Sequence, residues 1–139
     1  MGKMFVRDTM SRNIISIDAE ASIFDACKIY RDCKVGSIFI TNKNGLVGIV
    51  TERDFIERSM LSLLDIKKTK IKEIMSTNLK SIDSLENVEK AIESMKFNKI
   101  KKLAVIQGSE LVGIITLSDI AYSRPSVKNF LKDNKIIIS

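Results

Sequence analysis

The stretch "GIVTERD" at residues 48–54 returns sixty-five positions later as "GIITLSD" at residues 113–119. Sliding the sequence by 65 aligns residues 6–56 with residues 71–121 without a gap, and fourteen of the fifty-one aligned positions are identical. Self-similarity over such a length indicates a duplicated structural unit. The sequence therefore predicts one fold written twice. We expect residues 4–64 to be the first repeat, residues 65–123 the second, and residues 124–139 a C-terminal tail.

Within each repeat the hydrophobic pattern changes in the same order. In the first repeat, residues 14–17 read as a short strand, and a helix follows from about Ser22 with apolar residues at the i, i+3, i+4, i+7 spacing. Two strands are expected at 36–41 and 46–50, joined by a turn, and a second helix begins near Thr51. Each repeat is thus an α/β (α+β) unit of order β-α-β-β-α. A unit of about 55 residues buries little apolar surface alone, so the two copies should pack about a pseudo-twofold axis.

Some classes of chemistry are excluded by composition. The chain contains no histidine, which rules out catalytic triads with an imidazole base and zinc sites of the usual histidine-containing kinds. Its two cysteines, Cys27 and Cys33, are separated by about 9 Å along the expected helix, too far for a disulfide. There is no glycine-rich phosphate-binding loop and no metal-ligand cluster. We therefore expect a protein that is not an enzyme, with no cofactor.

Charge and hydropathy bear on location and partners. No apolar run approaches the roughly 18 residues of a membrane helix, and residues 1–10 lack the apolar core of a signal peptide, so we expect a cytoplasmic protein with no membrane partner. Residues 1–65 carry nine basic and nine acidic side chains, whereas residues 66–139 carry fourteen basic and eight acidic ones. This asymmetry favours an anionic partner near the second half of the chain. A solvated, lysine-rich surface is the alternative.

The repeated motif has two interpretations. A threonine followed three residues later by an acid, as in Thr51 with Asp54 and Thr116 with Asp119, is a capping box that starts a helix. The same geometry also suits a nucleoside phosphate. Backbone amides at the helix start and the threonine hydroxyl can bind phosphate oxygens, and the aspartate can accept hydrogen bonds from the vicinal hydroxyls of a ribose.

The glycines of the motif, Gly48 and Gly113, also have two interpretations: a side chain there could obstruct a ligand, or the glycine could mark a bulge in the strand. Basic residues accompany the second copy only. Lys101 and its neighbours Lys99 and Lys102 precede a buried strand there, and the first copy has glycine and serine in place of two of these lysines. The two motifs therefore need not bind a ligand equally well.

Taken together, these residues resemble a known family. Two copies of a unit with "VRDTMSRNIISID" leading into an amphipathic helix, and a strand pair ending "GLVGIVTERD", are similar to a tandem pair of CBS domains, the arrangement called a Bateman module. The resemblance covers residues 4 to about 123. It implies a regulatory ligand-binding module that senses adenosine derivatives, namely AMP, ADP, ATP and, in some relatives, S-adenosylmethionine. It also implies a homodimer formed through helices and an unknown regulated partner protein.

The resemblance also implies site residues, in two clefts between the repeats. In such relatives the aspartate holds ribose, the threonine contacts phosphate, and backbone of the strand starts reads adenine. The first cleft would combine Thr51 and Asp54 with Lys80 and Ile100. The second would combine Thr116 and Asp119 with Ile15 and Val35, and two further cations, Lys101 and more weakly Arg53, would face phosphates.

The chain also departs from the family pattern. Phe39 and Ala104 stand where relatives often have a proline, and Gly36 replaces a basic residue in the first copy, which weakens the case for phosphate binding at the first cleft. Two other functions stay open. One is nucleic-acid binding by the basic second half, although stacking aromatic residues are scarce. The other is a scaffold whose clefts bind no nucleotide.

Overall fold

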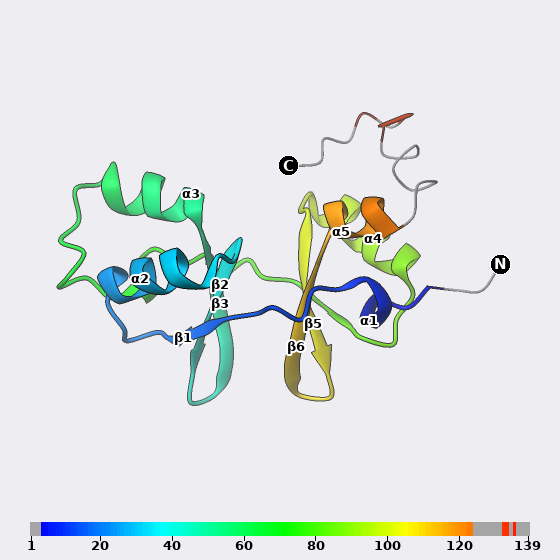
Figure 1. Ribbon diagram of the computed structural model, residues 1–139, viewed down its shortest axis with the longest axis horizontal. Helices are drawn as coiled ribbons and strands as arrows, with labels where there is room; N and C mark the ends of the chain where they lie inside the picture. Colours follow the sequence, from blue (N-terminus) through cyan, green and yellow to red (C-terminus); the bar gives the residue numbers. More distant parts are fainter. Residues whose placement is uncertain (1–3, 124–131, 134, 136–139) are drawn as a thin grey trace. The chain divides into compact units, whose positions relative to one another are not determined.

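The computed structural model describes residues 4–123, 132–133 and 135. These residues form two compact units (Figure 1). The first-repeat unit is Asn13–Leu79, and the second-repeat unit joins the described residues up to Arg12 with those from Lys80 onward. Packing of the two repeats about a pseudo-twofold axis stays a prediction.

Both units have the same secondary-structure order, which confirms the predicted β-α-β-β-α repeat. The first-repeat unit contains β1 (Ser16–Asp18), α2 (Ile23–Cys33), β2 (Ser37–Asn42), β3 (Gly45–Thr51), α3 (Glu52–Asp54), the π-helix η1 (Phe55–Met60) and the 3-10 helix η2 (Ile71–Glu73). The second-repeat unit contains α1 (Val6–Thr9), β4 (Ser81–Asp83), α4 (Val88–Asn98), β5 (Lys102–Gln107), β6 (Glu110–Thr116) and α5 (Leu117–Ser123).

Each unit holds one three-stranded sheet, in the orders β1-β2-β3 and β4-β5-β6. The outer strand β1 runs parallel to β2, and β3 runs antiparallel to β2, with the same pattern in the second sheet. Gly45 opens β3 with φ of 114°, a backbone conformation that glycine adopts without strain. In Figure 1 helices α2 and α3 lie to one side of the β2–β3 hairpin. The sheet thus brings the carboxyl end of β3 directly to the start of a helix.

The two long helices begin and end by the same local chemistry. Ser22 caps α2 by accepting a hydrogen bond from the Asp25 amide at 3.0 Å, and Asn87 caps α4 by accepting one from the Lys90 amide at 2.9 Å. Each helix ends at a lysine in the left-handed conformation: Lys34 has φ of 51° and Lys99 has φ of 55°. The predicted helix start near Ser22 is therefore confirmed.

Each unit has its own apolar core between its helices and its sheet. In the first-repeat unit, Ile23 and Ala26 of α2 are fully buried together with Ile38 and Ile40 of β2. In the second-repeat unit the core cluster consists of Val6, Met10, Val88, Ala91, Met95, Leu103, Val105, Ile115, Leu117, Ile120 and Ala121. The apolar face expected for the helices is the one that is buried.

The lead-in segments, which precede β1 and β4 in sequence, are exchanged between the repeats. Residues 5–11 hydrogen-bond within the second-repeat unit: the Val6 amide donates to the Glu86 carbonyl at 2.8 Å, and the Ser11 amide donates to the Ile114 carbonyl at 2.8 Å. Residues 70–76 do the same in the first-repeat unit, where the Ser76 amide donates to the Ile49 carbonyl at 2.9 Å. The boundaries of the compact units, at residues 12/13 and 79/80, therefore differ from those of the sequence repeats expected at 4–64 and 65–123. Most of the expected tail, residues 124–139, lies outside the described residues.

Candidate functional site

In the first-repeat unit the repeated motif lies where β3 ends and α3 begins. Thr51 is the last residue of β3, and both its backbone amide and its hydroxyl donate to Oδ2 of Asp54, at 2.8 and 3.3 Å. Both side chains are half-buried. The carboxylate is therefore held in the first turn of the helix, next to the end of the strand, as a capping role requires.

The second copy repeats this arrangement with a full capping box. The Thr116 amide donates to Oδ2 of Asp119 at 3.1 Å, and the Asp119 amide donates to the Thr116 hydroxyl at 3.1 Å. Among the described residues no hydrogen bond or ion pair involves Oδ1 of Asp119. The capping interpretation is thus confirmed in this copy, and one carboxylate oxygen remains in a position to accept from a ligand hydroxyl.

Arg58 distinguishes the two copies, and sequence reasoning did not find it. Its Nε lies 3.5 Å from Oδ1 of Asp54, and its Nη1 donates to the carbonyls of Ile74 and Met75 at 3.4 and 3.1 Å. The corresponding position in the second repeat is Ser123. The i, i+4 spacing of Asp54 and Arg58 on a helix is the signal that could have revealed this pair. A ribose at Asp54 would have to share the carboxylate with a guanidinium.

A methionine side chain packs directly against each motif glycine. A Cβ placed on Gly48 would lie 2.6 Å from Sδ of Met75, and one on Gly113 would lie 2.7 Å from Sδ of Met10 and 2.7 Å from the Ser11 carbonyl. The pairing of β2 with β3 also shifts register beside Gly48, which confirms the predicted bulge. The absence of a side chain therefore admits the lead-in segment, a role independent of any ligand.

The predicted residues of the strand starts take part in the sheets through their backbone. The Ile15 carbonyl accepts from the Phe39 amide at 2.9 Å, and the Lys80 carbonyl accepts from the Ala104 amide at 3.0 Å. These bonds extend the parallel pairing of β1 with β2 and of β4 with β5 by one residue. Both carbonyls therefore already have a hydrogen-bond partner within the sheet, before any adenine binds.

The other predicted residues divide between the units. Val35 is buried in the core of the first-repeat unit, and Ile100 is half-buried against the core of the second. Arg53 is exposed and pairs with Glu57 at 2.8 Å. Lys101 is exposed, and its backbone carbonyl accepts from the Leu117 amide at 3.0 Å. Each predicted cleft needs residues of both units, so both remain predictions.

Candidate metal ligands and thiols were also located among the described residues. No group of three or more histidine, cysteine, aspartate or glutamate side chains there could hold a metal ion. Cys27 and Cys33 are both free thiols. Burial raises the pKa of the Cys27 thiol, so less of it is present as the reactive thiolate. A search of the same residues also finds no helix with the length and apolar character needed to cross a bilayer.

Comparison with known proteins agrees with this architecture. The family profile described as "CBS domain" matches residues 6–61 and again residues 71–125. The CBS domain-containing protein YhcV of Bacillus subtilis (strain 168) is 30% identical over 121 residues, which cover 87% of this chain and 86% of that protein.

Solved structures give the same result. An uncharacterized conserved protein from Pyrococcus horikoshii superposes with a TM-score of 0.76 at 25% identity, covering 88% of this chain and 94% of that one. A hexameric CBS-CP12 protein from bloom-forming cyanobacteria superposes with a TM-score of 0.81 at 26% identity, covering 96% of this chain and 77% of that one. With two profile matches that span most of its length, this chain belongs to the CBS domain family and carries two CBS domains in tandem.

Proposed function

We propose that this protein is a regulatory module that binds an adenosine derivative, AMP, ADP or ATP or alternatively S-adenosylmethionine, and passes its occupancy to another protein. The observation that carries the proposal is the duplicated turn at residues 51–54 and 116–119, where a carboxylate is oriented by the threonine amide at the junction of strand and helix. A carboxylate held in this way accepts hydrogen bonds from two vicinal hydroxyls without first having to be ordered.

The two turns are unequal, and the second is the better ribose acceptor. Oδ1 of Asp54 already lies near a guanidinium, whereas the corresponding oxygen of Asp119 meets no partner among the described side chains. A bound ribose at the first turn would have to displace or share Arg58. We therefore propose that Asp119 contributes more to nucleotide affinity than Asp54 does.

Occupancy must be transmitted to another molecule if the chain regulates without catalysis. A ligand shifts an equilibrium between two conformations only by its difference in affinity for them. The exchanged lead-in segments offer a mechanical link, because Met75 and Ser76 contact β3 just before the turn, while Ile74 and Met75 accept from Arg58. A ligand that draws Asp54 away from Arg58 would release one hold on residues 74–75.

Thermal unfolding with added AMP, ADP, ATP or S-adenosylmethionine tests the proposal. A ligand present at a hundred times its dissociation constant should stabilise the folded protein by about 2.7 kcal/mol. We expect Asp119→Ala to remove most of this stabilisation and Asp54→Ala to remove less. Glu110→Ala is the control, because it removes an exposed acid at the start of β6, the strand whose other end is Thr116.

Three outcomes would contradict the proposal. If none of the four compounds raises the unfolding temperature, the module does not sense adenosine derivatives. If both aspartate variants bind as tightly as the parent, the carboxylates act only as helix caps. If single-stranded nucleic acid binds instead, with an affinity that falls steeply with salt and ignores mononucleotides, the basic second half has a different partner.

A further inference from the structure

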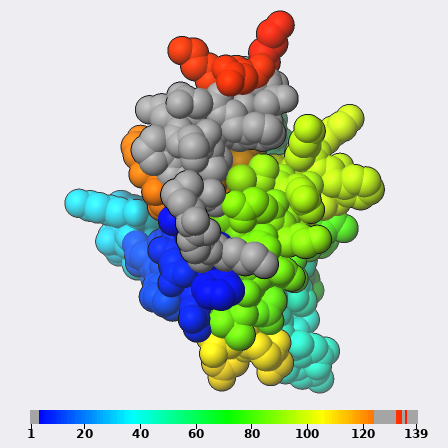
Figure 2. Space-filling model, turned by 90° about the vertical axis from the view of Figure 1, so that its right-hand side faces the viewer, coloured from blue at the N-terminus to red at the C-terminus, as the bar shows by residue number. Residues whose placement is uncertain are grey.

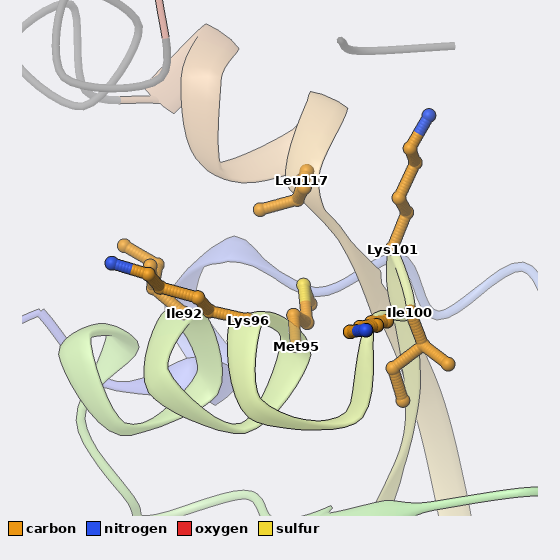
Figure 3. A pocket seen from close by; sticks show the side chains of 7 residues that line it. Ile92, Met95, Lys96, Ile100, Lys101 and Leu117 are labelled. Carbon is orange, nitrogen blue, oxygen red and sulfur yellow. The ribbon is translucent and has the colours of Figure 1, made fainter. Parts of the chain in front are cut away.

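The second-repeat unit contains a pocket of about 240 Å³ at the C-terminal end of α4 and the start of α5 (Figure 3). Its floor is apolar and its rim is cationic. The floor is formed by Ile92, Met95, Ile100 and Leu117, and the rim by Lys96, Lys99 and Lys101. Neither Thr116 nor Asp119 lines it, so it is distinct from the turn proposed to hold ribose.

In the first-repeat unit, aromatic residues stand at two of the corresponding positions in this region. Met95 corresponds to Tyr30 and Ile120 to Phe55, and those two rings pack edge to face with centroids 5.7 Å apart. Of the two aliphatic counterparts only Met95 lines the pocket, so the two repeats differ at this wall in the size and shape of one side chain.

The charges around the pocket are also more positive than those at the corresponding positions of the first repeat. Leu117 stands where the first repeat has Glu52, and Lys101 stands where it has Gly36, so the second repeat has lost an acid and gained a base. Arg31, which corresponds to Lys96, pairs with Asp32 at 2.7 Å, whereas the neighbour of Lys96 is Phe97. The rim of the pocket thus favours an anion, and its floor favours a hydrocarbon.

Three of the lining residues follow one another along α4. Ile92, Lys96 and Lys99 follow one another at i, i+4 and i+7, a distance of about 10 Å along the helix axis at 1.5 Å per residue. Figure 3 shows Met95 and Leu117 on opposite walls, with the Lys101 side chain extending away from the floor. In Figure 2 the yellow-green side chains of this region project from the surface. An engineered apolar cavity of about 150 Å³ accepts benzene, so this one has room for a longer hydrocarbon.

We propose that this pocket binds a medium-chain carboxylate, with the hydrocarbon chain on Ile92, Met95 and Leu117 and the carboxylate among the rim lysines. Apolar contact supplies the binding free energy, and the lysines orient the head group toward solvent. This inference goes beyond the proposed nucleotide function and does not depend on it. Ile100 and Lys101 belong to both sets of residues, which makes competition between the two ligands measurable.

Calorimetric titration of the full chain with sodium octanoate tests the proposal. We expect saturable binding, weaker binding of neutral 1-octanol, and an affinity reduced about tenfold or more in Met95→Tyr, which restores the ring of the first repeat. Leu85→Tyr is the control, since it places a tyrosine at an exposed apolar site outside the pocket and should bind as the parent does. Lys96→Gln combined with Lys99→Gln tests the rim without changing the core, and should weaken octanoate more than octanol.

Several results would overturn the inference. Absence of octanoate binding to the parent would do so, as would an equal loss in Leu85→Tyr. Loss of octanoate binding in Asp119→Ala would mean that octanoate occupies the nucleotide cleft. If octanoate does not bind and Met95→Tyr changes the sedimentation of the protein, the occupant is a second copy of the chain. Failure of AMP binding alone would leave the octanoate result unaffected, so the two proposals fail separately.

Discussion

At the scale of single residues, the tightest constraint is the contact between each motif glycine and the methionine above it. A Cβ at residue 113 would lie 2.7 Å from both the Met10 sulfur and the Ser11 carbonyl. The sulfur is the end of a flexible side chain, but the carbonyl belongs to a backbone that is hydrogen-bonded to Ile114. We therefore expect Gly113→Ala to lower the free energy of unfolding by about 1–3 kcal/mol, the usual cost of overpacking, measured by urea denaturation.

Gly36→Ala is the control for this experiment. Nothing lies within 4 Å of a Cβ at residue 36, and its φ is not in the left-handed region, so this variant should be as stable as the parent or slightly more stable. Equal stability of the two alanine variants would mean that the lead-in segment gives way at little cost and does not hold the strand.

Residue-scale prediction from the sequence succeeded where the chemistry is local. Thr116 and Asp119 are three residues apart, and their spacing alone predicts the reciprocal hydrogen bonds that the structure contains. The contact of Met10 with Gly113 joins positions 103 residues apart, and no local pattern encodes it. The ion pair of Asp54 with Arg58 was within reach of helix spacing but was not predicted. Contacts between residues close in sequence could thus be predicted, whereas contacts between distant residues could not, however much they contribute to the structure.

At the scale of elements, the 3-10 helix η2 is held to the first-repeat unit by a charged cluster. Glu20 forms ion pairs with Lys70 and with Lys72. Hydrogen bonds from these two ammonium groups lower the pKa of Glu20 from 4.5 to about 2. Because the folded pKa is depressed, the stability that this carboxylate contributes is present above pH 4.5 and is lost as the pH falls toward 2.

Replacing this carboxylate should therefore have a pH-dependent effect. We expect Glu20→Gln to lower the unfolding temperature slightly at neutral pH, and the difference from the parent to shrink as the pH falls below 4.5. Because all three side chains are exposed, added salt should also shrink it. Glu57→Gln, which breaks a pair within one helix, is the control. A difference that stays constant down to pH 2 would show that the ion pairs with Lys70 and Lys72 do not stabilise η2.

Element prediction was accurate where periodicity and caps agree. The helix from Ser22, the strand pair and its turn all lie where the pattern placed them, within one or two residues. The first strand begins at Ser16, whereas residues 14–17 were expected, because residue pairing with β2 starts with Ser16 and Phe39, and Ile15 contributes only its carbonyl. The pattern also predicts a helix after Thr51 without indicating its winding, which is π-helical over Phe55–Met60. The exchange of lead-in segments had no local signal and was missed.

At the scale of the whole molecule, exposed apolar side chains offer a candidate surface for the predicted homodimer. The resemblance to tandem CBS domains implies a homodimer formed through helices, and the helix-containing stretches 55–64 and 88–97 are the surfaces to test for it. In the first of these, Ile56, Met60, Leu61 and Leu63 are exposed, whereas in the second Phe97 is the large apolar residue that the structure leaves exposed. Clustered apolar exposure marks interaction surfaces more reliably than an isolated residue does. We therefore place the predicted interface at residues 56–63.

Charge at the centre of this surface should separate the subunits. Met60 and Leu61 are 66% and 74% exposed, so Met60→Lys with Leu61→Lys should leave the fold intact. Burying each side chain at an interface is worth up to about 1.5–3 kcal/mol, so loss of both should raise the dimer dissociation constant at least about tenfold. Sedimentation velocity across a range of concentrations measures this change, and Phe97→Lys is the control. If Phe97→Lys dissociates the protein and the double variant does not, the interface lies at the end of α4. A parent protein that sediments as a monomer at every concentration would contradict self-association itself.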